Sequence, residues 1–152
     1  MHFKGSRENH SSLYHIAGLI QNKDVTSTII NFVIDTGSTL TIISVKDAIR
    51  LKLLSLKEDT FELINNYNLP IEKTHTSTGS MDLLKLDDII LSFYFSDKCY
   101  FAEYIEAIYA AKPMIKNEDE YKVMMEIPSV LGIDILKNYK IEFSNDIVLL
   151  ER

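Results

Sequence analysis

The chain has 152 residues, 46% of them hydrophobic and 25% charged, which is the composition of an ordinary globular domain. A domain of this length buries roughly 70% of the surface that its unfolded chain exposes, so it needs no disulfide to fold. Its 22 acidic and 16 basic side chains give a net charge of -6. This balance argues against nucleic-acid binding as the main role, because binding to phosphates needs clustered Lys and Arg.

The sequence carries no pattern typical of export or of a membrane span. Cys99 is the only cysteine, so no intrachain disulfide can form, which fits a reducing compartment. Residues 1–12 are polar and lack the apolar stretch of a secretory signal peptide. No run of about 18 apolar residues occurs. We therefore expect a cytoplasmic protein without a membrane partner, with a flexible N-terminal tail at 1–12 and one domain at 13–152.

Two apolar stretches open the predicted domain. Residues 13–20 and 25–34 are rich in apolar and β-branched residues and predict two strands. The Asn-Lys-Asp sequence at 22–24 predicts the turn between them. The hairpin leads directly into Asp35-Thr36-Gly37-Ser38.

A short buried strand and a helix are expected next. The β-branched sequence Thr-Ile-Ile at 41–43 predicts the strand, and the spacing of apolar residues over 45–53 predicts the helix. Ser44 and Asp47 have the spacing of a capping box at the start of this helix. Residues 55–70 give no clear pattern.

The remainder predicts mainly strands. Asp87-Asp88 is expected to be a turn, and the charged residues 110–126 a surface insertion, partly helical. A short helix is expected over 133–139. The predicted strands and hairpins are a hairpin within 71–86, strands at 89–95, 100–109 and 127–131, and a closing hairpin of 141–143 with 147–150.

The sharpest chemical signal is Asp35, which directly follows the apolar sequence Phe32-Val33-Ile34. A carboxylate at the end of a buried strand is costly unless donors surround it. Gly37 allows a tight turn that points a backbone N–H at the carboxylate. Thr36 and Ser38 add hydroxyl groups, and Ser38 is expected to donate to the outer carboxylate oxygen.

This motif resembles that of the retropepsin-like aspartic proteases, whose sequence is apolar-apolar-Asp-Thr-Gly-Ser/Ala. The family's second mark, an apolar-apolar-Gly step before a short helix, is matched by Val130-Leu131-Gly132. The resemblance covers roughly residues 13–150. It implies an all-β, mostly antiparallel, closed barrel-like acid-protease fold with one or two short helices.

The resemblance also implies a mechanism and a partner. Hydrolysis in this family needs two carboxylates that share one proton around a water molecule. The chain has one such motif, and Asp24, Asp134 and Asp146 lack the following Thr-Gly. A homodimer is therefore expected to supply a second Asp35, with Thr36 reaching across the two-fold axis. Because hydrogen bonds to the ionised form lower a carboxylate pKa, Ser38 favours an acidic pH optimum.

The family's flap, a hairpin that closes over the substrate, is expected at 74–81 with its tip near Thr78, Gly79 and Ser80. The substrate is then an extended peptide or unfolded protein, held between the flap and the carboxylates. No cofactor is expected. No metal is expected either, since the four histidines lack ligand spacing.

Two simpler interpretations stay open at this point. Asp35 can be an ordinary turn residue, with Thr36 and Ser38 as ordinary turn hydroxyls and Gly132 as a packing glycine. Alternatively, the chain is a catalytically silent dimer of the same fold that serves as a peptide-binding or assembly module. Asp134 either supports the motif loop or a dimer contact, or lies in the first turn of its helix, where an acid suits the helix dipole.

Overall fold

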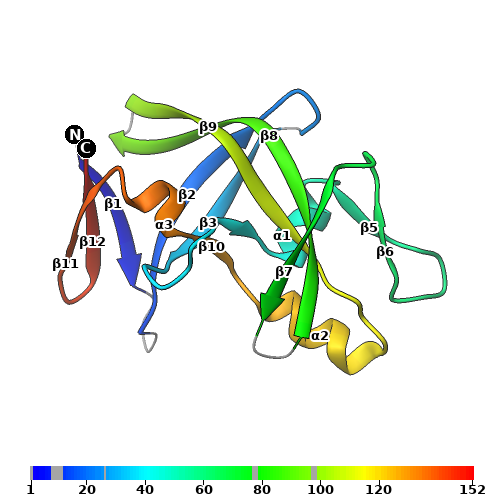
Figure 1. Cartoon of the computed structure of the whole chain (residues 1–152). Helices are drawn as coiled ribbons and strands as arrows, with labels where there is room; N and C mark the ends of the chain where they lie inside the picture. The colour runs from blue at the N-terminus through cyan, green and yellow to red at the C-terminus, as the bar shows by residue number, and fades with distance from the viewer. Residues whose placement is uncertain (1, 8–11, 26, 77–78, 97–98) are drawn as a thin grey trace.

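A computed structural model describes the chain except for residues 1, 8–11, 26, 77–78 and 97–98. Strands dominate these described residues, and three short helices are interspersed among them (Figure 1). The elements are β1 (His2–Arg7), β2 (Tyr14–Gln21), β3 (Thr28–Ile34), β4 (Ile42–Ile43), α1 (Val45–Arg50), β5 (Leu54–Leu56), β6 (Leu63–Asn65), β7 (Ile71–Thr76), β8 (Gly79–Ser96), β9 (Cys99–Lys112), α2 (Glu118–Glu126), β10 (Ser129–Leu131), α3 (Ile133–Leu136), β11 (Lys140–Phe143) and β12 (Ile147–Glu151).

The central feature is a sheet that closes on itself. The strands β2, β3, β10, β4, β9 and β8 follow one another, and β8 pairs again with β2. Closure leaves these strands without free edges. The pairs β3–β10 and β4–β9 are parallel, and the other pairs of this ring are antiparallel. The predicted all-β, mostly antiparallel, barrel-like fold is therefore confirmed, and the part of the chain that the structure describes contains three helices in place of one or two.

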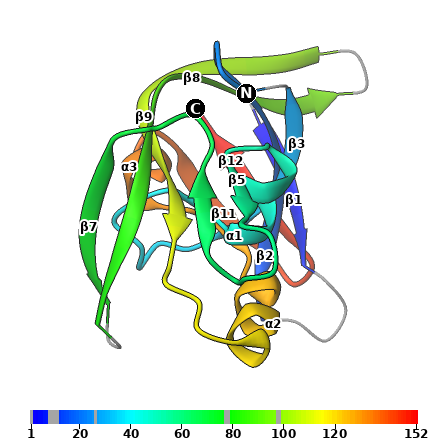
Figure 2. The same ribbon diagram turned by 90° about the vertical axis from the view of Figure 1, so that its right-hand side faces the viewer.

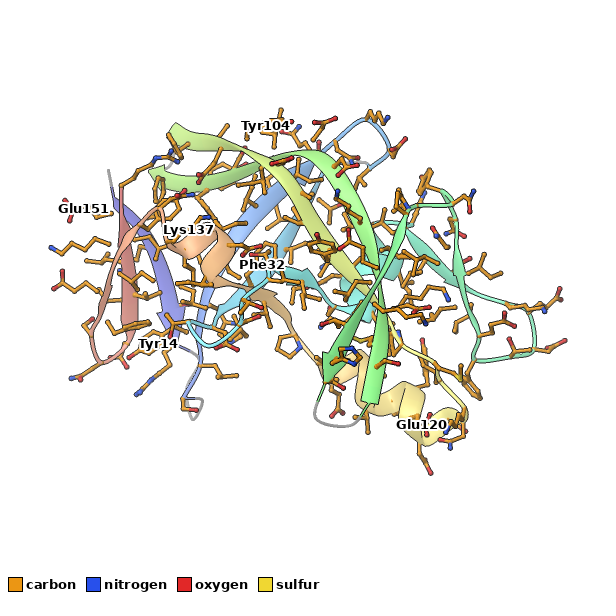
Figure 3. The ribbon with its side chains drawn as sticks, viewed as in Figure 1. Tyr14, Phe32, Tyr104, Glu120, Lys137 and Glu151 are labelled. Atoms are coloured by element: carbon orange, nitrogen blue, oxygen red, sulfur yellow. The ribbon has the colours of Figure 1, made fainter. Side chains whose placement is uncertain are left out.

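The interior of the barrel holds large apolar side chains. Phe32 of β3, Ile16 of β2 and Leu84 of β8 are all buried (Phe32 is labelled in Figure 3). The last three residues of β3, Phe32 to Ile34, are buried in succession. Burial of such side chains stabilises the fold by roughly 1.5–3 kcal/mol each. The chain that carries Asp35 therefore leaves a firmly anchored strand.

A second sheet region joins the two ends of the chain. The strand β1 lies between β12 and β2, with Phe3 opposite Leu150 and Arg7 opposite Tyr14. Both termini lie together at one side of the molecule (Figure 1). The predicted flexible tail at 1–12 is therefore wrong for His2–Arg7. Phe3 is fully buried against the rings of Phe93 and Phe101, and this burial holds the strand in place.

One further prediction needs correction. The predicted turn at Asp87-Asp88 is not a chain reversal, because β8 runs through it. Asp88 takes a positive φ of 56°. The register of β8 with β9 includes Asp87 and Ile89 and omits Asp88. Asp tolerates this left-handed conformation better than most residues, so the strand bends locally and continues.

The helical predictions hold with shorter bounds. Ser44 caps α1 by accepting a hydrogen bond from the Asp47 N–H, and the helix ends at Arg50. The expected insertion at 110–126 begins as the end of β9 and continues into α2, which Asn117 caps. The stretch 55–70, which gave no pattern, contains the small hairpin of β5 and β6.

A buried carboxylate ties the C-terminus to the barrel. Glu103 of β9 accepts hydrogen bonds from the Tyr139 hydroxyl and the Asn138 amide, and it pairs with Arg152 at 2.8 Å. The guanidinium of Arg152 lies 5.1 Å from the ring centre of Phe101. Burial of the hydroxyl and its bond to Glu103 raise the pKa of Tyr139.

Tyr139→Phe is expected to lower the free energy of unfolding by about 1–3 kcal/mol at neutral pH, because buried Glu103 loses a donor. The wild-type chain should also lose stability as pH rises above about 10, the ordinary Tyr pKa, since the folded state binds the Tyr139 proton more tightly. The variant should show a shallower fall. Urea unfolding at neutral and alkaline pH measures both effects, with exposed Tyr67→Phe as the control. Equal slopes for wild type and Tyr139→Phe would contradict the assignment.

Candidate active site

Asp35 lies immediately after β3, with an exposed side chain at the edge of the barrel. Its backbone N–H donates to the Leu131 carbonyl at 3.2 Å, which continues the parallel pairing of β3 with β10. Its carboxylate oxygen Oδ1 accepts a hydrogen bond from the Gly37 N–H at 2.9 Å. The carboxylate is thus oriented from one side and open to solvent on the other.

The motif forms a tight turn. The Ser38 N–H donates to the Asp35 carbonyl at 3.2 Å, closing the four-residue turn. A Cβ atom at position 37 would lie 3.2 Å from Asp35 Oδ1, which is a tight contact, so glycine leaves room for the carboxylate beside the backbone of the turn. The sequence argument for Gly37 agrees with this geometry.

The hydroxyl of Ser38 has a different hydrogen-bond acceptor from the one predicted. Its Oγ donates to the Leu40 carbonyl at 2.8 Å, so its one proton is used within the loop. The hydroxyl therefore stabilises the loop backbone and does not donate to Asp35 in this structure. Thr36 is exposed beside it.

A second loop crosses against the motif loop at Gly132. The Ile133 N–H donates to the Ser38 carbonyl at 2.8 Å, and the Gly132 N–H donates to the Thr41 hydroxyl at 3.0 Å. A Cβ atom on Gly132 would lie 2.4 Å from the Leu40 carbonyl oxygen. Only glycine allows the two backbones to approach this closely, which matches the structural role predicted for Gly132.

Asp134 supports this crossing from α3. Its Oδ1 accepts from the Thr41 hydroxyl at 2.7 Å and the Ile135 N–H at 2.9 Å, and its Oδ2 accepts from the Thr41 N–H at 2.9 Å. Of the roles considered for Asp134, the structure supports both a place in the first turn of α3 and a contact near the motif loop. With both oxygens engaged, it is poorly suited to act as a second catalytic acid.

A buried polar network lies further along β10, and sequence reasoning missed it. Asp47 of α1 accepts hydrogen bonds from Ser129 Oγ at 2.6 Å and from Arg50 at 2.7 Å. Ser129 Oγ accepts in turn from the Ser44 N–H at 2.8 Å. Only the capping pair Ser44 and Asp47 was visible in the sequence; Ser129 is 82 residues from Asp47. The network fixes α1 against the strand that leads to Gly132.

The candidate flap is the hairpin of β7 and the first part of β8. Thr76 pairs with Gly79, and the Thr76 hydroxyl donates to the Gly79 carbonyl at 2.9 Å. Gly79 has a φ of 136°, a conformation that L-residues rarely adopt, and exposed Ser80 pairs with His75. Thr78 lies outside the described residues. The hairpin extends from the barrel toward the same end as α2 (Figures 1 and 2).

Among the residues that the structure describes, no cluster of three or more His, Cys, Asp or Glu side chains has the geometry of a metal site. In the same part of the chain, no helix has the length and apolar character needed to cross a membrane.

Comparison with known proteins identifies the architecture. No family model matches the sequence, and no curated protein matches it. A solved structure does match: the crystal structure of a retropepsin-like aspartic protease from Rickettsia conorii. It shares 16% sequence identity and a TM-score of 0.54, over 99% of this chain and 90% of that chain.

The chain has the acid-protease fold. At this level of identity the likeness concerns the fold, and it extends over almost the whole chain. The fold includes the closed barrel, and the crossing of residues 35–38 with Gly132 lies at the edge of that barrel. The chemistry of the site has to be argued from the residues themselves.

Asp134→Ala is expected to lower the free energy of unfolding by about 2–3 kcal/mol, because the N–H and hydroxyl of Thr41 lose their acceptor. Chemical denaturation measures the change, and Glu58→Ala, an exposed position, is the control. A loss as small as that of the control would show that Asp134 does not support the crossing.

Proposed function

We propose that the protein is an aspartic endopeptidase that works as a homodimer, with one Asp35 from each copy. The observation that carries the proposal is the state of the Asp35 carboxylate. It is exposed, oriented by the Gly37 N–H, and presented by a rigid turn at the barrel edge. A carboxylate held on one side and open on the other is suited to bind a water molecule shared with a second carboxylate.

In this mechanism the two Asp35 side chains share one proton. The ionised one takes a proton from the water, whose oxygen attacks the scissile carbonyl carbon. The protonated one donates to the carbonyl oxygen, giving a tetrahedral diol. Transfer of a proton to the leaving nitrogen then accompanies cleavage of the C–N bond. The motif loop contributes position, because its own backbone bonds hold Asp35 in place.

Exposed apolar side chains flank the motif loop and favour a two-fold contact there. Leu13 directly precedes β2, in which His15 pairs with Val33, two residues before Asp35. Leu13 is 44% exposed, and Ile133, next to Gly132, is 39% exposed. Phe143 is 48% exposed, and its ring centre lies 4.9 Å from that of Tyr14. Burial of such side chains together with the loop would favour self-association of two copies.

The substrate of such a dimer is an extended polypeptide. The hairpin of β7 and β8 is suited to cover it, and β7 stands at one end of the strand order of the sheet. Main-chain hydrogen bonds from the hairpin would hold a peptide strand without regard to its sequence. Apolar residues beside the cleaved bond are the default preference.

The pH dependence follows from the shared proton. The active state holds one proton on the pair, so activity should fall when the pH exceeds the higher pKa of the pair and both acids ionise. The Ser38 hydroxyl donates to the Leu40 carbonyl and not to Asp35. The proposed acidic optimum therefore depends on the proton that the two Asp35 carboxylates share. An optimum on the acidic side is therefore proposed, and a profile centred above neutrality would oppose it.

Asp35→Asn tests the chemistry. The amide can neither accept the proton of the water nor share one with its partner, so cleavage of casein should fall at least about 1,000-fold, in line with loss of essential acid–base groups. Sedimentation should show the dimer unchanged. A dimer that binds peptides but cleaves nothing, in wild type as in variant, would instead identify a silent binding module.

Thr36→Val tests the assembly. Loss of two symmetry-related hydroxyl contacts, each worth about 1 kcal/mol, should raise the dimer dissociation constant about 10- to 100-fold. Sedimentation equilibrium measures this constant, and exposed Thr39→Val is the matched control three residues away. If both variants dimerise like wild type, Thr36 does not cross the axis.

A further inference from the structure

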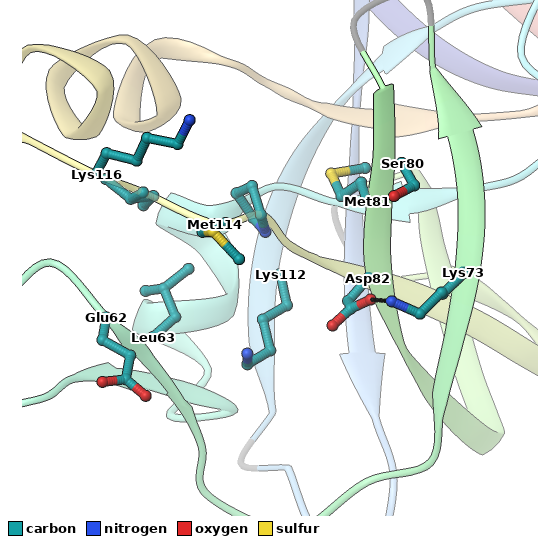
Figure 4. Close-up of a pocket in the computed structure, with 11 residues that line it drawn as sticks. Glu62, Leu63, Lys73, Ser80, Met81, Asp82, Lys112, Met114 and Lys116 are labelled. Carbon is teal, nitrogen blue, oxygen red and sulfur yellow. Dashed lines mark hydrogen bonds and ion pairs between the residues drawn. The ribbon is translucent and has the colours of Figure 1, made fainter.

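A cavity of about 630 Å³ lies beside the candidate flap, on a part of the molecule that the proposed chemistry does not use. Its walls come from three separate segments: the β7–β8 hairpin, the start of β6, and the chain between β9 and α2 (Figure 4). Its size is within the range of sites that bind small molecules or side chains.

The cavity has an apolar wall. Of the residues that line it, Leu63 and Ile115 are buried, and Met81 is half-buried on the hairpin. Met114 is 85% exposed at the rim. Such a wall suits the methylene groups of a ligand that also carries a polar group. It excludes water from one side of that ligand.

A row of alternating charges crosses the cavity. Lys73, Asp82 and Lys112 stand opposite one another on three adjacent strands, so their side chains share one face of the sheet. Lys73 pairs with Asp82 at 3.2 Å. Within the part of the chain that the structure describes, no ion pair is recorded for Lys112, whose ammonium group extends into the space between Leu63 and Asp82 (Figure 4).

The other acid at the cavity is already engaged. Glu62 pairs with Lys57 at 3.5 Å, outside the cavity. The lining therefore holds Lys73, Lys112 and Lys116 against Glu62 and Asp82, a surplus of positive charge on a chain whose net charge is -6. A cation beside an apolar wall recognises a carboxylate carried on an apolar stem.

We propose that this cavity binds an acidic side chain of the polypeptide substrate, outside the segment that is cleaved, with Lys112 as the charge that recognises it. The inference rests on the proposed endopeptidase function. It favours a peptide because the hairpin that would cover the substrate also forms one wall of the cavity. Asp or Glu at one position along the substrate would then bind Lys112, with its stem against Met81 and Leu63.

Binding is measured with the Asp35→Asn dimer, so that cleavage does not interfere. Fluorescein-labelled peptides share one sequence and carry a single Glu or Gln at successive positions on either side of an apolar pair. Fluorescence anisotropy should show one position at which Glu binds about fivefold more tightly than Gln, the size of a partly exposed ion pair. High salt should reduce the difference.

Two variants identify the cavity as the cause. Lys112→Met should remove the preference for Glu over Gln, and Lys112→Glu should reverse it in favour of a peptide with Lys at that position. Lys46→Met, on the exposed face of α1, should leave the preference unchanged. Equal binding of Glu and Gln peptides at every position, or a preference that survives Lys112→Glu, would overturn the inference.

The two proposals fail in different ways. Wild type that cleaves peptides with no Glu preference would leave the endopeptidase in place and remove the acidic subsite. Wild type that cleaves nothing, while Asp35→Asn still binds the Glu peptide through Lys112, would remove the endopeptidase and leave the cavity as an acidic-peptide site.

Discussion

The structure depends on the backbone contact between the motif loop and the chain at Gly132. Asp35 bonds to Leu131, and Ile133 bonds to Ser38, through main-chain groups on both sides of this glycine. These bonds form because β10 lies between β3, with which it pairs in parallel, and β4, with which it pairs antiparallel. The position of Asp35 is therefore set by backbone groups, and its carboxylate is left exposed for other chemistry.

The acids that support the fold differ from Asp35 in how many hydrogen bonds their carboxylates accept. Asp134, Asp47 and Glu103 each accept at least two hydrogen bonds from nearby groups. Asp47 and Glu103 are buried and Asp134 is partly buried, and such carboxylates are costly without donors, so these hydrogen bonds stabilise α1, the C-terminus and the loop at Gly132. Asp35 is oriented by the Gly37 N–H and faces solvent. This contrast is the physical reason to assign the chemistry to Asp35.

Much of this arrangement was predictable from local patterns. The apolar strand before Asp35, the glycine at 37 and the Leu131-Gly132 step all reflect steric needs that act over a few residues, and the barrel strands follow from apolar runs. Features that depend on distant contacts were not predictable. The strand β1 is held by β12, some 145 positions away in the sequence, and Glu103 finds its partners in Tyr139 and Arg152. The predicted bond from the Ser38 hydroxyl to Asp35 is wrong, because the Leu40 carbonyl, two residues ahead, lies within reach and accepts it.

The most direct measurement is a crystal structure of the wild-type chain that resolves how two copies associate. The account predicts a two-fold dimer in which the two Asp35 carboxylates lie about 3 Å apart, as carboxylates that share a proton do. A monomer in crystal and solution, or a dimer with these carboxylates well separated, would contradict it.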